Sequence, residues 1–370
     1  MGRVALEAGL LAALLSAALT PLLIHVSRGV GLVDSPTTGK IHLYPTPTAG
    51  GLVVFVAFFS TLWGIALRMG RSGEMDLRTL GGLTLASVLI VALGLYDDVR
   101  GAGVWQKLAV QIPAGLLLYL AGFRVDRLTN PFGSEILLGP LALPLTLLWV
   151  LTITNALNLI DGLDGLATGI ALIATLTLAT VGLARGEVLV LVLASTLGGS
   201  LLGFVGYNFP PARIFLGDTG SLLLGLLLSA ISLVENRKAT LAMTLVVPIV
   251  AMLIPILDTL WAVVRRVKNR QHLFRGDTDH LHHRLLMLGL PQRRAVLLMW
   301  ATGAYFGLLA FVLSVLPKEQ VLWAVVLLGA GVYAALSFLR HLERRAKAHR
   351  QSPLPSAEKN PGPKASGNGK

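Results

Sequence analysis

The chain has 370 residues, of which 54% are hydrophobic and only 14% are charged, and its formal net charge is +12. A soluble domain of this size does not tolerate so apolar a composition, so the sequence predicts an all-α membrane protein that crosses the bilayer many times. The absence of cysteine excludes disulfides, thiolate catalysis and cysteine-ligated metals.

Eleven apolar stretches are each near the length that a membrane-spanning helix requires. The first is interpreted as a retained span, because it starts with Glu7 rather than a basic segment and no cleavage signature follows it. Pro248 and Pro255 are expected to kink or break the ninth. The predicted spans are residues 4–27, 49–67, 79–96, 107–123, 142–160, 166–184, 188–207, 221–234, 240–264, 295–316 and 321–340.

The basic residues divide unevenly between the two sets of loops. If the N-terminus lies outside, the opposite set of loops and the C-terminal tail hold 21 of the 31 Lys and Arg residues. The positive-inside rule then places these loops and the C-terminus in the cytoplasm, and the net charge is explained without nucleic-acid binding. Residues 1–340 form the expected transmembrane domain, and residues 341–370 form an expected basic, disordered tail rich in Pro, Gly and Ser.

Nine of the eleven aspartates and all eight histidines lie on or beside the predicted cytoplasmic face. The ordinary preference of polar residues for loops does not explain this bias, since the outer loops receive only Asp76 and Asp126. In the segment YDD, Asp97 and Asp98 are adjacent at a membrane boundary, where two carboxylates repel each other unless they share a cation or a proton. Lys107 is a candidate partner, and a polar helix end is the alternative interpretation.

The segment NALNLIDGLDGL places Asn155, Asn158, Asp161 and Asp164 at three-residue intervals. Each interval falls about 60° short of a helical turn, so the four side chains share one cleft only if the helix tightens or breaks. Gly162 and Gly165 permit such a break. The pattern favours a ligand site over a capped helix end.

The segment NFPPARIFLGDTGS combines a basic side chain with a glycine-rich turn before an apolar stretch. Backbone amides at a helix N-terminus suit phosphate, and Arg213 suits anions. Asp218, which follows Gly217, suits a hard cation that arrives with the phosphate. A capping turn is the competing explanation, and for Ser221 alone it is the better one.

The segment FRGDTDHLHHRLL places His280 and His283 on one helical side. Zinc is disfavoured, because the aspartates on the same face supply oxygen ligands that suit Mg²⁺. The imidazoles, with Arg275 or Arg284, are better used on pyrophosphate oxygens. The predicted face offers no activated Ser or Cys nucleophile, which fits metal-assisted phosphoryl transfer, and the membrane setting implies that one substrate is a lipid.

Six motifs occur in a fixed order between about residues 30 and 290. They are DSPTTGKIHLYPTPTAGG (34–51), GLYDD (94–98), KLAVQ (107–111), NALNLIDGLDGLATG (155–169), NFPPARIFLGDTGS (208–221) and DTDHLHHRLL (277–286). In these motifs the chain resembles the polyprenyl-phosphate N-acetylhexosamine-1-phosphate transferases, which are related to the MurNAc-pentapeptide transferase of peptidoglycan synthesis. The His-Leu-His-His form of the last motif is more similar to the N-acetylglucosamine transferases.

The resemblance implies a reaction and its location. A UDP-N-acetylhexosamine and undecaprenyl phosphate give undecaprenyl-diphospho-sugar and UMP in a cleft at the cytoplasmic face of the cell membrane, as the first membrane step of cell-envelope polysaccharide synthesis. Mg²⁺ is the implied cofactor, with Mn²⁺ as a substitute. Direct attack by the lipid phosphate and a two-step route through an aspartyl phosphate are both open. The alternatives are transfer of phospho-MurNAc-pentapeptide and, from another class, cation-coupled secondary transport; a homodimer is compatible with the sequence.

The resemblance also implies residue roles. The metal ligands are Asp218 and, as a second candidate, Asn158. The catalytic residues are Asp97, Asp98, Asp161 and Lys107, of which the paired aspartates hold the lipid phosphate or remove its proton. The nucleotide and diphosphate contacts are Asn155, Asn158, Asp161, Asp164, Arg213, Gly217, His280, His282 and His283. First-loop candidates are Lys40 and His42, although Gly39 stands where the family usually carries Arg and Thr278 where a basic residue is common.

Overall fold

The computed structural model describes residues 2–35, 44–69, 76–128, 136–235, 246–268, 270, 280–317, 320–321, 323–333 and 337. The first-loop candidates Lys40 and His42 lie outside these residues. The chain divides into two compact units, Met1–Leu322 and Trp323–Lys370. All the elements that follow belong to the first unit, and in the second unit Trp323–Tyr333 forms a short apolar helix.

The described part of the chain is mostly helical, which confirms the predicted all-α membrane class in outline. Its long helices are α1 (Gly2–Val30), α2 (Gly50–Met69), α3 (Leu77–Arg100), α4 (Val104–Leu120), α5 (Ala142–Ile160), α6 (Leu166–Arg185), α7 (Val188–Asn208), α8 (Gly217–Glu235), α10 (Leu253–Lys268) and α12 (Gln292–Val315). Shorter helices are η1 (Gly139–Leu141), α9 (Val246–Ala251) and α11 (Leu281–Met287). Eight of the described helices are long and apolar enough to cross a membrane: α1, α2, α3, α5, α6, α7, α8 and α12.

Two small hairpins were not predicted from the sequence. Strand β1 (Val33–Asp34) pairs antiparallel with β2 (Thr46–Pro47), and β3 (Arg127–Leu128) pairs antiparallel with β4 (Ile136–Leu137). Each strand has two residues, so the hairpins tie loop ends together without adding a sheet to the core.

Each of the eleven predicted spans overlaps a helix, but their lengths differ from the prediction. The ninth consists of two helices, since α9 ends at Ala251 and α10 begins at Leu253, close to the break expected from Pro248 and Pro255. Helix α4 has 17 residues, which is at the lower limit of what a bilayer crossing requires. The count of eleven membrane crossings and their orientation therefore stay predictions.

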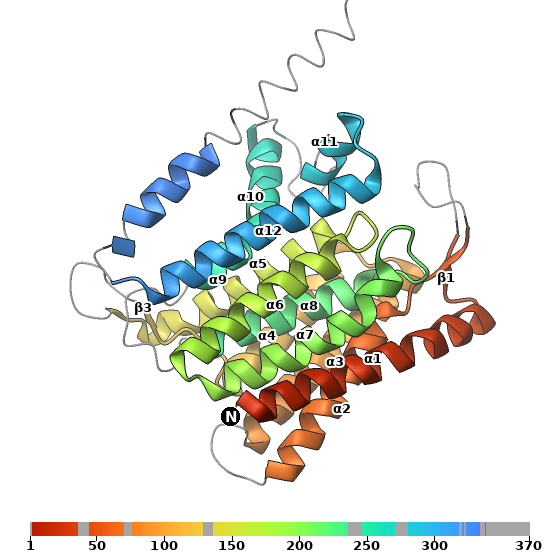
Figure 1. Ribbon diagram of the computed structural model, residues 1–370, viewed down its shortest axis with the longest axis horizontal. Helices are drawn as coiled ribbons and strands as arrows, with labels where there is room; N and C mark the ends of the chain where they lie inside the picture. Colours follow the sequence, from red (N-terminus) through yellow and green to blue (C-terminus); the bar gives the residue numbers. More distant parts are fainter. Residues whose placement is uncertain are drawn as a thin grey trace, which may run out of the picture. The chain divides into compact units, whose positions relative to one another are not determined.

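Helix α8 is the central element of the first unit. It packs against α2, α3, α5, α6 and α7, and its apolar residues from Leu222 to Leu228 are completely buried (Figure 1). Small residues allow its neighbours to approach closely. A Cβ added at Gly94 of α3 would lie 2.3 Å from the Cα of Thr219, and one added at Gly225 would lie 2.4 Å from the Cα of Thr154 on α5. These contacts bring the start of α8 beside the ends of α3 and α5.

The helix that carries NALNLIDGLDGL breaks where the sequence predicted. Helix α5 ends at Ile160, and α6 begins at Leu166 after Gly165, which adopts the left-handed conformation with φ 70°. That conformation strains any residue with a Cβ, so glycine is required at this position. The break turns Asp161 and Asp164 out of the helix and leaves Asn155 and Asn158 on its last turns.

Candidate active site

A cavity of about 800 Å³ lies where the start of α8, the end of α3 and the α5–α6 break meet. Its wall is polar and acidic. The predicted site residues that line it are Asp98, Asp161, Asp164, Gly217, Asp218 and His283. Asp34 and Thr48 of the first motif also line it, so the structure brings residues from five of the six sequence motifs to one cavity.

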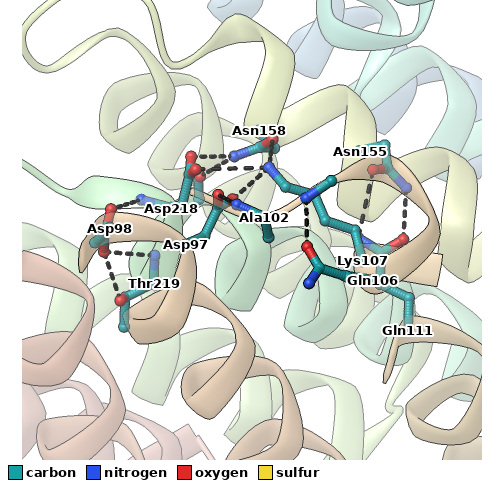
Figure 2. A network of polar contacts seen from close by, with 12 residues as sticks. Asp97, Asp98, Ala102, Gln106, Lys107, Gln111, Asn155, Asn158, Asp218 and Thr219 are labelled. Atoms are coloured by element: carbon teal, nitrogen blue, oxygen red, sulfur yellow. Dashed lines mark hydrogen bonds and ion pairs between the residues drawn. The ribbon is translucent and has the colours of Figure 1, made fainter. Parts of the chain in front are cut away.

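Asp98 of α3 caps the first turn of α8. Its Oδ1 accepts a hydrogen bond from the Asp218 amide at 2.7 Å, and its Oδ2 accepts hydrogen bonds from the Thr219 amide at 3.1 Å and from Thr219 Oγ1 at 2.6 Å (Figure 2). The first amides of a helix have no partner within the helix, and a carboxylate satisfies them well. This cap explains why α8 begins at Gly217, four residues before the predicted start of this span at 221.

Asp97 points away from Asp98 and pairs with Lys107 of α4 (Figure 2). Its other oxygen accepts a hydrogen bond from the Ala102 amide at 2.6 Å. Lys107 Nζ also lies 3.5 Å from Asp218 Oδ2, so one ammonium group is placed between two carboxylates. The predicted partnership of Lys107 with the paired aspartates is confirmed for Asp97.

Asn158 joins α5 to the start of α8. Its Nδ2 donates to Asp218 Oδ1 at 2.6 Å and to Ser221 Oγ at 2.9 Å, and its Oδ1 lies 3.5 Å from Lys107 Nζ. Figure 2 shows Asp218 held between Asn158 and Lys107. The amide thus orients the Asp218 carboxylate at the cavity wall.

Asn155 and Asp164 have partners that the sequence did not indicate. Asn155 faces α4, where it donates from Nδ2 to Gln111 Oε1 at 2.9 Å and accepts from Gln111 Nε2 at 3.3 Å (Figure 2). Asn155 does not line the cavity. Asp164 lines it and accepts a hydrogen bond from the Ala212 amide at 3.0 Å, which fixes the segment before α8.

Asp161 differs from the other carboxylates of the cavity. Among the residues that the structure describes, no group donates a hydrogen bond to it, although it lines the wall with intermediate exposure. Burial raises the pKa of Asp161 well above its usual value, and the nearby charges of Asp218, Asp98 and Asp164 raise it further. A raised pKa makes the Asp161 carboxylate a stronger proton acceptor than an ordinary aspartate.

The three histidines at the start of α11 are unequally exposed. His283 lines the cavity, whereas His280 and His282 are 3% and 1% exposed. Burial, and then the neighbouring His283, lowers the pKa of His282 to about 4, so this ring is neutral at physiological pH. Arg213, the anion contact predicted from the sequence, is exposed and does not line the cavity.

Within the described ranges, no group of three or more His, Asp or Glu side chains has the arrangement of a metal site. Mg²⁺ typically uses only one or two protein carboxylates and completes its shell with substrate phosphates and water. Asp218 and Asp161 both offer oxygens at the cavity wall. The donor set therefore fits Mg²⁺ held jointly with a phosphorylated substrate and does not fit a closed protein cage.

Comparison with known proteins identifies the family. The model of glycosyl transferase family 4 matches residues 80–236. A probable undecaprenyl-phosphate N-acetylglucosaminyl 1-phosphate transferase of Bacillus subtilis (strain 168) is 37% identical over 306 residues, which cover 82% of this chain and 82% of that relative. The chain belongs to glycosyl transferase family 4.

Two further relatives have names that describe different transferases. The decaprenyl-phosphate N-acetylglucosaminephosphotransferase of Mycobacterium tuberculosis (strain ATCC 25618 / H37Rv) is 34% identical over 362 residues, covering 91% of this chain and 89% of the relative. A phospho-N-acetylmuramoyl-pentapeptide-transferase of Streptococcus equi subsp. zooepidemicus (strain MGCS10565) is 32% identical over 284 residues, which cover 73% of this chain and 84% of the relative. The part matched by the family 4 model contains Asp97, Asp98, Lys107, Asp161 and Asp218 but ends before α10 and the histidines.

Proposed function

We propose that this chain transfers N-acetylglucosamine 1-phosphate from UDP-N-acetylglucosamine to undecaprenyl phosphate, which gives undecaprenyl-diphospho-N-acetylglucosamine and UMP. The observation that carries the proposal is the cavity at the start of α8. Its wall includes Asp218, held by Asn158 and Lys107, and Asp161, to which no described residue donates a hydrogen bond. Two of the relatives are named as polyprenyl-phosphate N-acetylglucosamine phosphotransferases, which supports this donor.

The proposal extends to the metal and the membrane side. Asp218 would hold Mg²⁺ together with the diphosphate of the donor, and the ion would neutralise charge on the phosphate oxygens when bound. Asn158, the second candidate ligand, uses its amide nitrogen on Asp218 and Ser221, so we assign the ion to Asp218. The excess of Lys and Arg on one set of loops supports a cytoplasmic cavity, where UDP-sugars are available.

The reaction requires one bond to form and one to break at the same phosphorus. An oxygen of the lipid phosphate attacks the β-phosphorus of the UDP-sugar, and the bond between this phosphorus and the bridging oxygen to the α-phosphate breaks, so that UMP leaves. Lys107, which pairs with Asp97 and lies 3.5 Å from Asp218 Oδ2, would attract the incoming lipid phosphate. Asp161 is the carboxylate free to accept any proton on that phosphate, because the oxygens of Asp98 are committed to α8.

The choice of donor is tested by a parallel assay. Purified protein in lipid nanodiscs with undecaprenyl phosphate and Mg²⁺ receives either UDP-N-acetylglucosamine or UDP-MurNAc-pentapeptide, and release of UMP is measured. We expect UMP only with UDP-N-acetylglucosamine. Activity with the pentapeptide donor alone would overturn the proposal and favour the branch represented by the Streptococcus relative.

The direct route is tested separately. Incubation with UDP-N-acetylglucosamine labelled in the β-phosphate, in the absence of lipid, should leave the protein unlabelled. A phosphorylated aspartate trapped under these conditions would contradict direct attack and identify a two-step route with a carboxylate nucleophile.

A further inference from the structure

A carboxylate outside every motif of the sequence contacts the histidine segment. Asp258 of α10 lies with Oδ2 2.8 Å from His280 Nδ1, and its Oδ1 accepts a hydrogen bond from the Leu281 amide at 2.9 Å. The side chains of Asp258 and His280 are 7% and 4% exposed. One buried carboxylate therefore holds both the residue that precedes α11 and the first amide of that helix.

The contact bears on the tautomer and the orientation of the His280 ring. An ionised carboxylate only accepts hydrogen bonds, so when Asp258 is ionised the contact requires a proton on Nδ1 of His280. A carboxylate in this position fixes both the tautomer and the orientation of an imidazole, as it does for histidines that bind metals. His280 itself does not line the cavity. Its fixed orientation can therefore affect the cavity only through the residues that pack against it.

The neighbours of His280 form a packed series of rings. The His280 and His282 rings are parallel, with centroids 5.8 Å apart, and the His282 and His283 centroids are 4.2 Å apart. His282 fills the space beside Gly162, where an added Cβ would lie 2.2 Å from its Nε2. His283, at the end of the series, lines the cavity. The three rings form a continuous series from Asp258 to the cavity wall.

We propose that Asp258 is a positioning residue for the transfer reaction: by holding His280 and the start of α11, it fixes His283 at the part of the cavity that receives the UDP-sugar. The inference rests on the proposed function, since it assigns a substrate to this cavity. It extends the site to α10, beyond the part of the chain that the family model matches.

The test is Asp258→Asn in the transfer assay, with kcat and KM measured for each substrate. The asparagine oxygen still accepts from the Leu281 amide, but the amide nitrogen only donates, so the contact persists only if the His280 ring moves its proton to Nε2, and the tautomer set by the carboxylate is lost in either case. We expect kcat/KM for UDP-N-acetylglucosamine to fall about 10- to 100-fold, the usual cost of removing a carboxylate that orients a functional histidine. The KM for the UDP-sugar should rise while the KM for undecaprenyl phosphate stays unchanged. A simple loss of folded enzyme would lower kcat and leave both KM values unchanged.

Two further variants make the result specific. His280→Gln breaks the same contact from the other side, so it should show the same KM pattern, and its combination with Asp258→Asn should be no worse than the more severe single variant. Asp76→Asn is the matched control, because Asp76 accepts the Thr79 amide at the start of α3 at 2.7 Å and is remote from the motifs of the site. It should leave both KM values unchanged.

The possible failures are distinguishable. A normal wild-type rate together with normal kinetics of Asp258→Asn would overturn the inference alone. If the losses of kcat/KM in Asp258→Asn and His280→Gln multiply in the double variant, the two residues act independently. That result would also overturn the inference. Absence of transfer by the wild type would overturn the proposed function and the inference with it.

Discussion

Asp98 and Asp161 line the same cavity, but the fold treats their carboxylates in opposite ways. Asp98 accepts three hydrogen bonds from the first residues of α8, whereas Asp161, on the α5–α6 break, accepts none from the described part of the chain. The first carboxylate belongs to the scaffold that places Asp218. The second lines the cavity wall without such partners, and its surroundings disfavour the ionised form.

This difference separates the carboxylates that hold the fold of the cavity from those that are available to a substrate. Groups that are fully paired fix geometry, and a buried group that is left unpaired is retained for a ligand or a reaction. On this argument Asp98 should matter for folding, Asp161 for turnover, and Asp218 for turnover most of all. The predictions below test that order, beginning with the largest expected effect.

Asp218→Asn is expected to abolish measurable transfer, with a loss of at least about 100-fold, the scale of removing one preorganised charge contact from an active site. The asparagine oxygen can still accept from Asn158, so the protein should remain folded. The measurement is the initial rate of UMP release per mole of monodisperse protein. Full activity of this variant would remove the metal assignment.

Asp98→Asn and Asp97→Asn should fail in different ways. The first removes a charged acceptor from three donors at the start of α8, so we expect the folded state to lose about 1.5–3 kcal/mol. The second keeps an oxygen for the Ala102 amide and loses only the ion pair with Lys107, so transfer should fall with a smaller change in melting temperature. Thermal unfolding and rates measured on both variants decide the point, and equal melting temperatures would contradict the role of Asp98 as a cap.

Asp161→Asn should raise stability while it lowers activity. Because the pKa of Asp161 is raised, the folded protein binds more protons than the unfolded chain between the ordinary value of 3.8 and the raised value. The stability contributed by this site is therefore present below the ordinary value and is lost as the pH rises from there through the raised pKa. The ligand-free variant should melt several degrees higher than the wild type at about pH 8, and the gain should shrink as the pH approaches 4. A lower melting temperature at pH 8 would mean that Asp161 has a stabilising partner.

Gly162→Ala should cause a moderate loss of transfer by displacing the histidine rings. The added methyl group would lie 2.2 Å from His282 Nε2, so either α11 or the α5–α6 break must shift. Gly206→Ala is the matched control, since no atom lies within 4 Å of the added Cβ on α7. If the two variants have the same transfer rate, the contact between His282 and the α5–α6 break has no functional consequence.

Truncation after Arg350 should have the smallest effect. The removed segment is rich in Pro, Gly and Lys, and its composition predicts that it adds little to the packed helices. Transfer by the truncated protein should match that of the full chain when both are assayed in the same nanodiscs. A large loss in well-expressed protein would give the tail an active role.

The sequence predicted those parts of the site that depend on local pattern. The break after Ile160 followed from three-residue spacing and glycine, and the partnership of Asp97 with Lys107 followed from charge at neighbouring membrane boundaries. These features need only the geometry of one helix or the electrostatics of a short loop.

The partners that sequence reasoning missed come from distant helices. Asn155 was expected at the nucleotide and instead pairs with Gln111, 44 residues away, and Asp258 reaches His280 across 22 residues. Such pairs depend on how α4 packs on α5 and α10 on α11, which periodicity along one helix does not determine. An unassigned polar residue on an otherwise apolar helix was the available signal in both cases, because the membrane makes an unpartnered polar group costly.

The central claim is that the bond broken lies between the two phosphates of the donor, and one labelling experiment tests it most directly. Wild-type protein receives UDP-N-acetylglucosamine labelled in the β-phosphate, with undecaprenyl phosphate and Mg²⁺, and the label is followed into lipid and water-soluble products. The account predicts that the label enters the lipid diphosphate in equal amount to unlabelled UMP, and that Asp218→Asn abolishes both. Label recovered as UDP, with the sugar transferred alone, would contradict it.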